Sequence, residues 1–406
     1  MSEMLQEYLN FGHSPYHVVK MASDRLCEAG FRHVSQEDIR NLPEGNYWLT
    51  VGDTTLFAFK IPAVKSGELR IAAAHTDYPC FKVKPDADMS PCGNCRRINV
   101  EPYGGMLRRT WFDRPLGIAG AVWLSGEDPF NPVMKIIDIN RPVCLIPSLA
   151  PHMDREIENK AIDVQKEMLP VTGLTGSKSL AEIIGEEAGC STEDILSYDL
   201  NLYVYSNALE AGSGGQLIMG QGIDNIASAA ALTEAFLNGE AKDGAVSMIC
   251  LFDNEEIGSR TRQSADSAVL AKVIEQLGTG TEKGFILSAD GAHGVHPNYP
   301  EKADPTAAAE VGKGLVIKTS ASRRYATEGR MIAVIRSICH ANDIPYQIQA
   351  NRSGNPGGST IGPIISSHVP MAAADIGIPM LAMHSACECA ALSDYDSLVE
   401  LIRVML

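Results

Sequence analysis

Residues 246–256 read VSMICLFDNEE, a nearly continuous apolar run that is followed at once by acidic side chains. The run has the length of a strand, and a strand without polar alternation is typical of a sheet that is covered on both faces. The acidic residues begin where this strand must end. The stretch therefore predicts a buried strand of an α/β sheet that carries carboxylates at its carboxyl end.

The chain on both sides of this strand has a related texture. Downstream, amphipathic helices are expected over 226–239, 265–278, 328–343 and 394–406, and strands over 285–290, 315–320 and 379–384. Upstream, a helix that starts near Ser14 is followed by strand-like runs at 47–52, 55–61 and 68–75. Strands that alternate with helices predict an α/β fold with a central, mostly parallel sheet flanked by helices.

Residues 86–219 differ from both flanks. They are rich in Pro and Gly, and their alternating runs at 132–139 and 200–206 indicate an antiparallel β module with a helical piece around 176–198. The Gly-rich stretch 211–222 is typical of a flexible join. We therefore expect a discontinuous α/β domain made of 1–85 and 220–406, interrupted by an inserted β-rich domain at 86–219.

The composition argues against several classes of protein. The 406 residues carry a formal net charge of −16, which argues against nucleic acid or an anionic membrane as partner. The sequence has neither a signal-peptide pattern at its start nor an apolar run long enough to span a membrane. The ten cysteines are scattered, so we expect reduced thiols in the cytoplasm. Cys92 and Cys95 form only half of a zinc-ribbon pattern and are expected to be two loop thiols.

Side chains that can bind metal follow several of the expected strands. The set comprises His75, Asp224, Asp253, Glu255, Glu256, Asp290 and His384. All but Asp224 come at or just after the carboxyl end of an expected strand, where open α/β sheets bind ligands. Each has an ordinary explanation, because a lone His is often structural, an Asp before a helix is often an N-cap, and paired glutamates are often solvated. Together they need a common cause, since burying neighbouring carboxylates is costly without a cation.

The residue types in this set suit zinc. Two His and three carboxylates supply the nitrogen and oxygen ligands of zinc, and two ions about 3.5–4 Å apart can share one carboxylate. The neighbours Glu255 and Glu256 point in different directions, so one can bind metal while the other handles protons. Asp77 can hold the imidazole of His75 in the tautomer that binds metal. The sequence thus predicts two divalent metal ions per subunit, with zinc as the leading candidate and cobalt or manganese as alternatives.

Motifs along nearly the whole chain resemble one known family. They are SPYH at 14–17, AHTD at 74–77, IPSLAPHMDR at 146–155, IDN at 223–225, DNEEIGS at 253–259, HPNYPEK at 296–302, RYAT at 324–327, PGGSTIGP at 356–363 and MHSACE at 383–388. In this order they resemble the aspartyl aminopeptidases, dizinc metallopeptidases that assemble into tetrahedral dodecamers. The resemblance implies an enzyme that hydrolyses the N-terminal residue from peptides and favours Asp or Glu there.

The resemblance also implies roles for matching residues. The ligands of one zinc ion would be His75, Asp224 and Asp290, and those of the other would be Asp224, Glu256 and His384, with Asp224 bridging. Glu255 would be the general base that takes a proton from the attacking water and returns it to the leaving amine.

Further residues are implied in substrate binding and assembly. The discontinuous α/β domain would be the metallopeptidase domain, and the inserted domain would serve as a lid and in dimerisation and larger assembly. His152 of the inserted domain would complete a neighbouring subunit's site and could stabilise the oxyanion. Lys318 matches the position that meets the acidic side chain of the substrate, and His293 and Arg324 are additional candidates for substrate binding. The implied partners are peptides with a free N-terminus and copies of this chain, in a dodecamer built from dimers.

The chain departs from the family pattern at a few positions. Gly291 and Gly294 replace bulkier residues, Cys387 stands where Arg is frequent, and the usual Arg or Pro before Asp224 is missing. None of these changes removes a ligand, but they leave a neutral or broad substrate preference open as an alternative. A catalytically silent oligomeric scaffold is an alternative from another class. A nucleotide-binding enzyme is a third, although the Gly-rich stretch lacks GxGxxG after a strand.

Overall fold

The chain forms two compact units in a computed structural model that describes residues 1–240, 244–355 and 357–406. The larger unit consists of Met1–Tyr78, Ala208–Met383 and Glu388–Leu406. The smaller unit consists of Pro79–Asn207 and His384–Cys387. Pro356, the first residue of the PGGSTIGP motif, lies outside the described residues.

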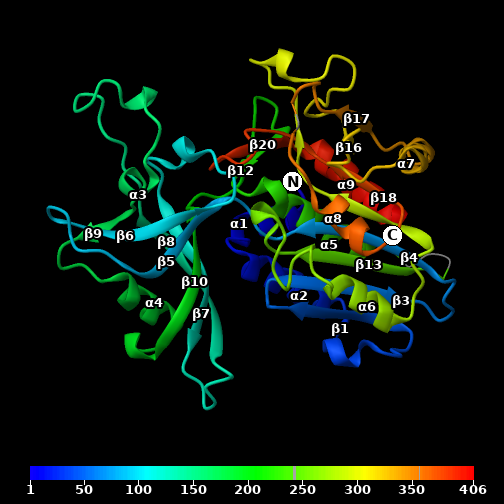
Figure 1. The fold of residues 1–406 in the computed structure, drawn as a ribbon, viewed down its shortest axis with the longest axis horizontal. Helices are drawn as coiled ribbons and strands as arrows, with labels where there is room; N and C mark the ends of the chain where they lie inside the picture. Colours follow the sequence, from blue (N-terminus) through cyan, green and yellow to red (C-terminus); the bar gives the residue numbers. More distant parts are fainter. Residues whose placement is uncertain (241–243, 356) are drawn as a thin grey trace. The chain divides into compact units, whose positions relative to one another are not determined.

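A nine-stranded sheet forms the centre of the larger unit (Figure 1). Its strands in spatial order are β1 (Arg32–His33), β2 (Gly45–Val51), β3 (Thr55–Ile61), β13 (Val246–Phe252), β4 (Glu68–His75), β14 (Lys283–Ala289), β18 (Ala373–Gly377), β16 (Leu315–Thr319) and β17 (Tyr346–Ala350). Five of the eight neighbouring pairs are parallel and three are antiparallel. The mostly parallel sheet is confirmed, with the stretch 246–252 as β13 between β3 and β4.

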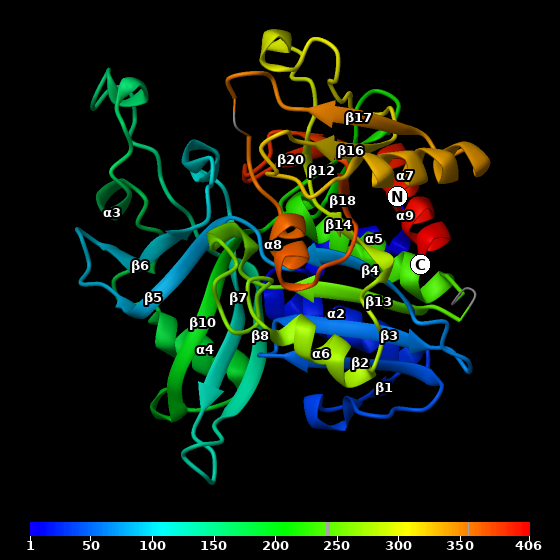
Figure 2. The ribbon, with the colours of Figure 1, turned by 45° about the vertical axis from the view of Figure 1, so that its right-hand side comes forward.

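Helices cover this sheet on both faces (Figure 2). The helices of the larger unit are α1 (Glu3–Phe11), α2 (Pro15–Glu28), α5 (Ser228–Asn238), α6 (Val269–Leu277), α7 (Gly329–Ala341), α8 (Ile361–His368) and α9 (Leu392–Met405). Apolar residues of α6 and α8 share one core cluster with Ile71 and Ala73 of β4. Because side chains alternate along a strand, the buried Ala72 and Ala74 face the other way, and α5 packs against β4 there.

Two expectations about this unit are wrong. The stretch 211–222 is no flexible join, because β11 (Leu209–Ala211) and β12 (Leu217–Gly220) form a hairpin and β12 pairs with β20 (Glu388–Ala391). These strands belong to a second sheet of five, completed by β19 (Pro379–Leu381) and β15 (Ala292–His293). The strand expected over 379–384 is therefore β19 of this second sheet, so His384 does not follow a strand of the central sheet.

The smaller unit is a six-stranded antiparallel sheet with two helices. In spatial order the strands are β8 (Val133–Cys144), β7 (Leu116–Leu124), β10 (Ile195–Val204), β5 (Cys80–Asp88), β6 (Cys95–Tyr103) and β9 (Val171–Leu174), and the helices are α3 (Val164–Glu167) and α4 (Leu180–Ala188). The helix expected over 176–198 is shorter. Ser179 and Glu182 form a capping box at its start, and Gly189 in the left-handed region ends it.

Membrane-spanning helices are not found in the described part of the chain, where no helix combines the necessary length and apolar character.

Candidate metal centre

Two neighbouring parallel strands bring His75 and Asp290 to the same edge of the central sheet. His75 is the last residue of β4, and Asp290 directly follows β14. Nε2 of His75 lies 3.5 Å from Oδ1 of Asp290 and 3.6 Å from Oδ1 of Asp224. All three side chains are buried, so their polar atoms are largely removed from water.

Asp224 is held in this cluster through its backbone. Gly222, with φ +71, turns the chain just before it. The backbone N–H of Asp224 donates to Oε2 of Glu388 at 2.9 Å, and Nδ2 of Asn225 donates to the backbone oxygen of Ala289 at 2.9 Å. The peptide bond between Asp224 and Asn225 is cis. The aspartate is thus connected both to β20 and to the end of β14.

Asp77 organises the loop that carries the two glutamates. After β13 the chain turns at Asn254, whose φ of +65 is a conformation that Asn tolerates. The backbone N–H groups of Glu255 and Glu256 then donate to Oδ1 and Oδ2 of Asp77, each at 3.1 Å. The carboxylate therefore caps the single helical turn Glu255–Ile257 and fixes where both glutamate side chains begin.

The ring of His75 is also oriented by Asp77. Nδ1 of His75 lies 3.0 Å from the backbone oxygen of Asp77 and 3.3 Å from its Oδ1. A proton on Nδ1 can be donated to these oxygens, which leaves Nε2 to face Asp224 and Asp290. The tautomer expected from the sequence therefore has support from the backbone carbonyl as well as from the carboxylate.

The electrostatics of this cluster favour a positive charge. Burial lowers the pKa of His75, but the carboxylates of Asp224, Asp290 and Asp77 outweigh it and raise the pKa well above its usual value. Burial raises the pKa of Glu255 to about 8; the charge of His75 opposes this rise, and the neighbouring aspartates add to it. Both shifts mean that His75 and Glu255 retain their protons to higher pH than usual, because several carboxylates lie close to them.

The donor set fits a divalent cation. The candidate ligand atoms of His75, Asp224 and Asp290 all lie within 4.8 Å of one another, and so do those of His75, Glu255 and Glu256. Imidazole nitrogen and carboxylate oxygen are ligands that zinc accepts. A cation here would also compensate the charges of buried carboxylates, which are costly when left unpaired. We conclude that these residues could hold metal.

Lys318 lies beside the same cluster in the larger unit. Its Nζ is 3.5 Å from Oδ2 of Asp290 and 5.4 Å from the ring centroid of Tyr325, and the residue is only 2% exposed. Burial lowers its pKa, but Asp290, Tyr325 and Asp375 raise it above the usual value. Lys318 is therefore a buried cation and not a solvated lysine at a strand end.

The other residues singled out from the sequence are carried by other segments of the chain. The side chains of His293, in β15, and Arg324 are exposed. His384 and His152 belong to the smaller unit. Nδ1 of His384 lies 3.1 Å from the backbone oxygen of Gly105, a contact that orients the ring, and His152 is exposed in a turn.

Two buried acidic residues beside Asp224 and Lys318 received no role from the sequence. Glu388 supports Asp224, and its only signal was its place in the MHSACE motif. Asp375 is paired in register with Lys318. Its carboxylate accepts hydrogen bonds from Oγ1 of Thr360 and from the backbone N–H of Ala326, both at 2.5 Å. An acidic residue within the apolar run around β18 was the signal that could have found it.

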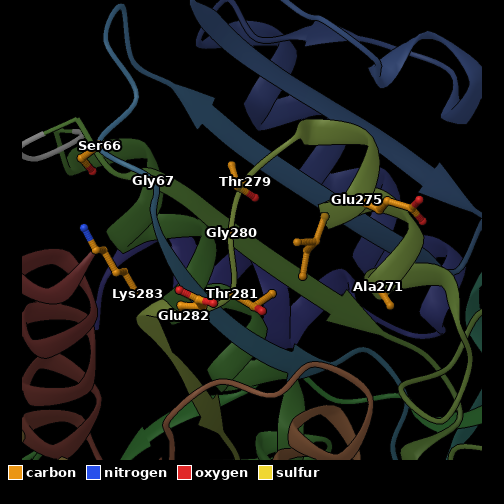
Figure 3. A pocket seen from close by; sticks show the side chains of 10 residues that line it. Ser66, Gly67, Ala271, Glu275, Thr279, Gly280, Thr281, Glu282 and Lys283 are labelled. Carbon is orange, nitrogen blue, oxygen red and sulfur yellow. The ribbon is translucent and has the colours of Figure 1, made fainter.

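A separate hollow lies at the opposite ends of β4 and β14 (Figure 3). Ser66 and Gly67 before β4, and Glu282 and Lys283 at the start of β14, contribute to its lining. Because the two strands are parallel, their amino ends are at the edge away from His75 and Asp290. None of the site residues predicted from the sequence lines this hollow, so it is distinct from the candidate metal centre.

Comparison with known proteins shows the family of this chain. Residues 8–405 match the family described as aminopeptidase I zinc metalloprotease (M18). The chain belongs to the M18 family. A probable M18 family aminopeptidase 2 of Clostridium acetobutylicum is 36% identical over an alignment of 414 positions, which covers 97% of this chain and 95% of the relative. A relative of the same description from Pseudomonas savastanoi pv. phaseolicola is 33% identical over 416 residues, covering 98% and 96% of the two chains.

Several solved structures share the fold of this chain. Ape4, in the cryo-electron microscopy structure of its complex with Nbr1, is 28% identical with a TM-score of 0.93, over 98% of this chain and 84% of Ape4. The crystal structure of prApe1 is 25% identical with a TM-score of 0.93, over 99% and 93% of the two chains. The mApe1 dodecamer of S. cerevisiae is 23% identical with a TM-score of 0.85, over 99% and 96%. This M18 protein is a metallo-aminopeptidase, as the sequence predicted.

Proposed function

We propose that this M18 aminopeptidase uses two divalent metal ions, with zinc as the preferred metal, to remove the N-terminal residue of peptides by hydrolysis. The enzyme favours Asp or Glu as that residue. The observation that carries this proposal is the buried cluster of His75, Asp224 and Asp290, with Glu255 and Glu256 held beside it by Asp77. The family supplies the reaction class, and the side-chain preference and the number of ions are our inference.

The proposed ligands divide between two ions. His75, Asp224 and Asp290 would hold the first ion, and Asp224, Glu256 and His384 the second. Support for His384 comes from Met383, which directly precedes it in the chain. Gly291 lies close to both Met383 and Asp224, because a Cβ on Gly291 would be 3.0 Å from Cε of Met383 and 3.1 Å from Cγ of Asp224. When bound, such ions supply Lewis-acid stabilisation of negative charge and make water a better nucleophile.

The remaining steps belong to side chains of the protein. Glu255 takes a proton from the attacking water and later returns it to the leaving amine. Asp77 keeps this base in place through the backbone N–H of Glu255. His152 of a neighbouring subunit donates a hydrogen bond to the oxyanion, and Lys318 meets the acidic side chain of the substrate. The exposure of His152 and the burial of Lys318 suit these two roles.

One observation favours a second candidate, a neutral or broad preference with the same chemistry. Nζ of Lys318 already lies 3.5 Å from Oδ2 of Asp290. Its charge could therefore serve the ligand rather than a substrate. A screen of aminoacyl-chromophore substrates with zinc, cobalt and manganese tests the preference and the metal together. A higher kcat/KM for Asp and Glu than for Leu or Ala derivatives supports the first candidate, and the reverse order supports the second.

The location of the enzyme is proposed from its cysteines. All ten are free thiols, and the accessible ones would be prone to oxidation outside a reducing compartment. We therefore infer a cytoplasmic enzyme.

Removing one ligand should lower the metal content. Glu256→Ala is expected to lose roughly half of the bound metal, because it leaves the ligands of the first ion intact. Elemental analysis of the purified protein gives the ratio of metal to protein. Glu301→Ala, at an exposed glutamate of the segment Pro300–Lys302, is the matched control and should bind metal like the wild type. An unchanged metal content in Glu256→Ala would remove this residue from the ligand set.

A site shared between subunits can be tested by mixing two inactive variants. His152→Ala and Glu255→Gln would each be inactive alone, but subunits reassembled from an equal mixture should recover about a quarter of the wild-type activity, since half of the bases then meet half of the intact histidines. Light scattering gives the mass of the particles before and after mixing, and a dodecamer is expected. If the mixture shows only the mean of the two separate activities, or if a monomer is fully active, His152 does not act in a neighbour's site.

A further inference from the structure

The hairpin between β5 and β6 ends in a tight turn formed by Cys92, Gly93, Asn94 and Cys95 (Figure 1, cyan). The N–H of Cys92 donates to the oxygen of Cys95 at 3.0 Å, and the N–H of Cys95 donates to the oxygen of Cys92 at 3.2 Å. Gly93, with φ +59, occupies the first central position, where a type II′ hairpin turn requires glycine. The two cysteines are thus held directly opposite each other.

This arrangement is compatible with a disulfide. Opposed residues that exchange both backbone hydrogen bonds have Cα atoms about 5.5 Å apart, within the range of about 4.4–6.8 Å seen for bridged cysteines. Their Cβ atoms are about 4.5–5.5 Å apart, and a disulfide needs about 3.5–4.5 Å. The Cβ atoms of this hydrogen-bonded pair therefore have to approach by at least about 1 Å, which an increase in the twist of the hairpin can supply.

One arm of the hairpin is anchored and the other is open to solvent. Cys95 is paired with Leu174 of β9, and the N–H of Thr175 donates to the oxygen of Asn94 at 3.0 Å. Cys92 is the first residue of the turn and is exposed. The small movement needed for closure can therefore be made by Cys92, while the sheet keeps Cys95 in place.

The pair differs from the buried cysteines of this enzyme. Burial raises the pKa of the Cys144 thiol to about 12 and that of Cys250 well above its usual value. Such thiols lie away from oxidants in solution and ionise little, and the thiolate is the reactive form. Cys92 is exposed and Cys95 is half-buried, so both can be reached from solution.

A metal site explains the pair less well than redox chemistry does. A structural zinc ion takes four ligands, and Cys92 and Cys95 supply only two. Within the described part of the chain, the groups of side chains that could hold a metal contain no cysteine. Two opposed, accessible thiols without further ligands are suited to forming a bond with each other.

We propose that Cys92 and Cys95 form a reversible redox site that is oxidised to an intramolecular disulfide by the disulfide of a small thiol such as glutathione. The thiolate of Cys92 attacks one sulfur of the oxidant, which forms a mixed disulfide and releases the first small thiol. The thiolate of Cys95 then attacks the sulfur of Cys92 and releases the second. The protein loses two electrons and two protons, and the oxidant gains both. The closed ring fixes the tip of the β5–β6 hairpin.

Alkylation after equilibration in glutathione redox buffers tests this site on the full-length enzyme. As the buffer becomes more oxidising, the peptide that carries both cysteines should change in one step from two alkyl groups to none, with the loss of two hydrogens in its mass. Cys92→Ser and Cys95→Ser should each leave the other cysteine as a mixed disulfide with glutathione. Cys27→Ser, at a single exposed cysteine of α2, is the control and should leave the transition unchanged.

A glycine variant tests the role of the turn. Gly93→Ala keeps both thiols, and the added Cβ meets no neighbouring atom, but alanine disfavours the positive φ of this position. Formation of the disulfide should then require a ratio of oxidised to reduced glutathione that is about five- to thirty-fold higher. An unchanged transition in Gly93→Ala would show that the turn does not bring the thiols together. Separate glutathione adducts on Cys92 and Cys95 in the wild type, without an internal disulfide, would overturn the proposal.

Discussion

Glu255→Gln is expected to lower kcat by about 10²–10⁴-fold, because an amide cannot take up the proton of the attacking water. The metal content should stay at the wild-type value. The substitution keeps the size of the side chain. It also keeps the backbone N–H of residue 255 that donates to Oδ1 of Asp77 at 3.1 Å, so the loop should retain its place. The loss would then report proton transfer and not a change of shape.

Single-turnover kinetics and elemental analysis on the same preparation check this result. Glu256→Gln is the matched comparison, since its backbone N–H donates to the other oxygen of Asp77 at the same distance of 3.1 Å. We expect it to lose metal along with activity. If Glu255→Gln loses metal and Glu256→Gln retains it, the two roles are exchanged. Turnover of Glu255→Gln near the wild-type rate would show that Glu255 is not the base.

The parts of the site that lie on parallel strands could be predicted from the sequence. A run without polar alternation must be buried on both faces, and the carboxyl ends of parallel neighbours meet at one edge. His75 and Asp290 follow this rule, because β4 and β14 are adjacent and in parallel register. Asp224 was singled out for a different reason, since it follows a Gly-rich stretch and the IDN motif resembles the family.

The features that the sequence could not predict depend on contacts between distant parts of the chain. The Gly-rich stretch 211–222 looks flexible by composition, but β12 gains order from its pairing with β20, which is far away in the chain. Likewise, nothing in the sequence around β19 indicated that this strand belongs to a second sheet. The capping of Glu255 and Glu256 by Asp77 spans 178 and 179 residues, and no local pattern encodes such a contact.

The burial of Lys318 was hidden for the same reason. A lysine near the end of a short apolar run is usually solvated, because burying its charge is costly. In the fold, β16 lies between β17 and β18, and Asp375 stands beside Lys318 in register. Nearby acidic side chains raise the pKa of this lysine in spite of its burial, so the charge is retained within the protein. A fixed buried cation is what selection of an acidic substrate requires.

Lys318→Met should therefore lower kcat/KM for substrates with N-terminal Asp or Glu by about 30-fold or more, because a buried carboxylate that loses its partner costs about 2–5 kcal/mol. Leu and Ala derivatives should change little, since they make no use of the charge. Lys313→Met, at an exposed lysine five positions earlier, is the control and should behave like the wild type toward both kinds of substrate.

The competing role of Lys318 beside Asp290 gives a different pattern. If its charge serves only to stabilise that ligand, Lys318→Met would change the metal content or lower kcat/KM for acidic and neutral substrates by the same factor. Lys318→Arg, which keeps the charge but enlarges the head group, should then restore both kinds of substrate equally. Under the proposed role, the arginine variant recovers part of the preference for acidic substrates, because a positive charge still faces the carboxylate. The ratio of kcat/KM for Asp over Leu substrates distinguishes the two roles, because a loss common to all substrates cancels in it.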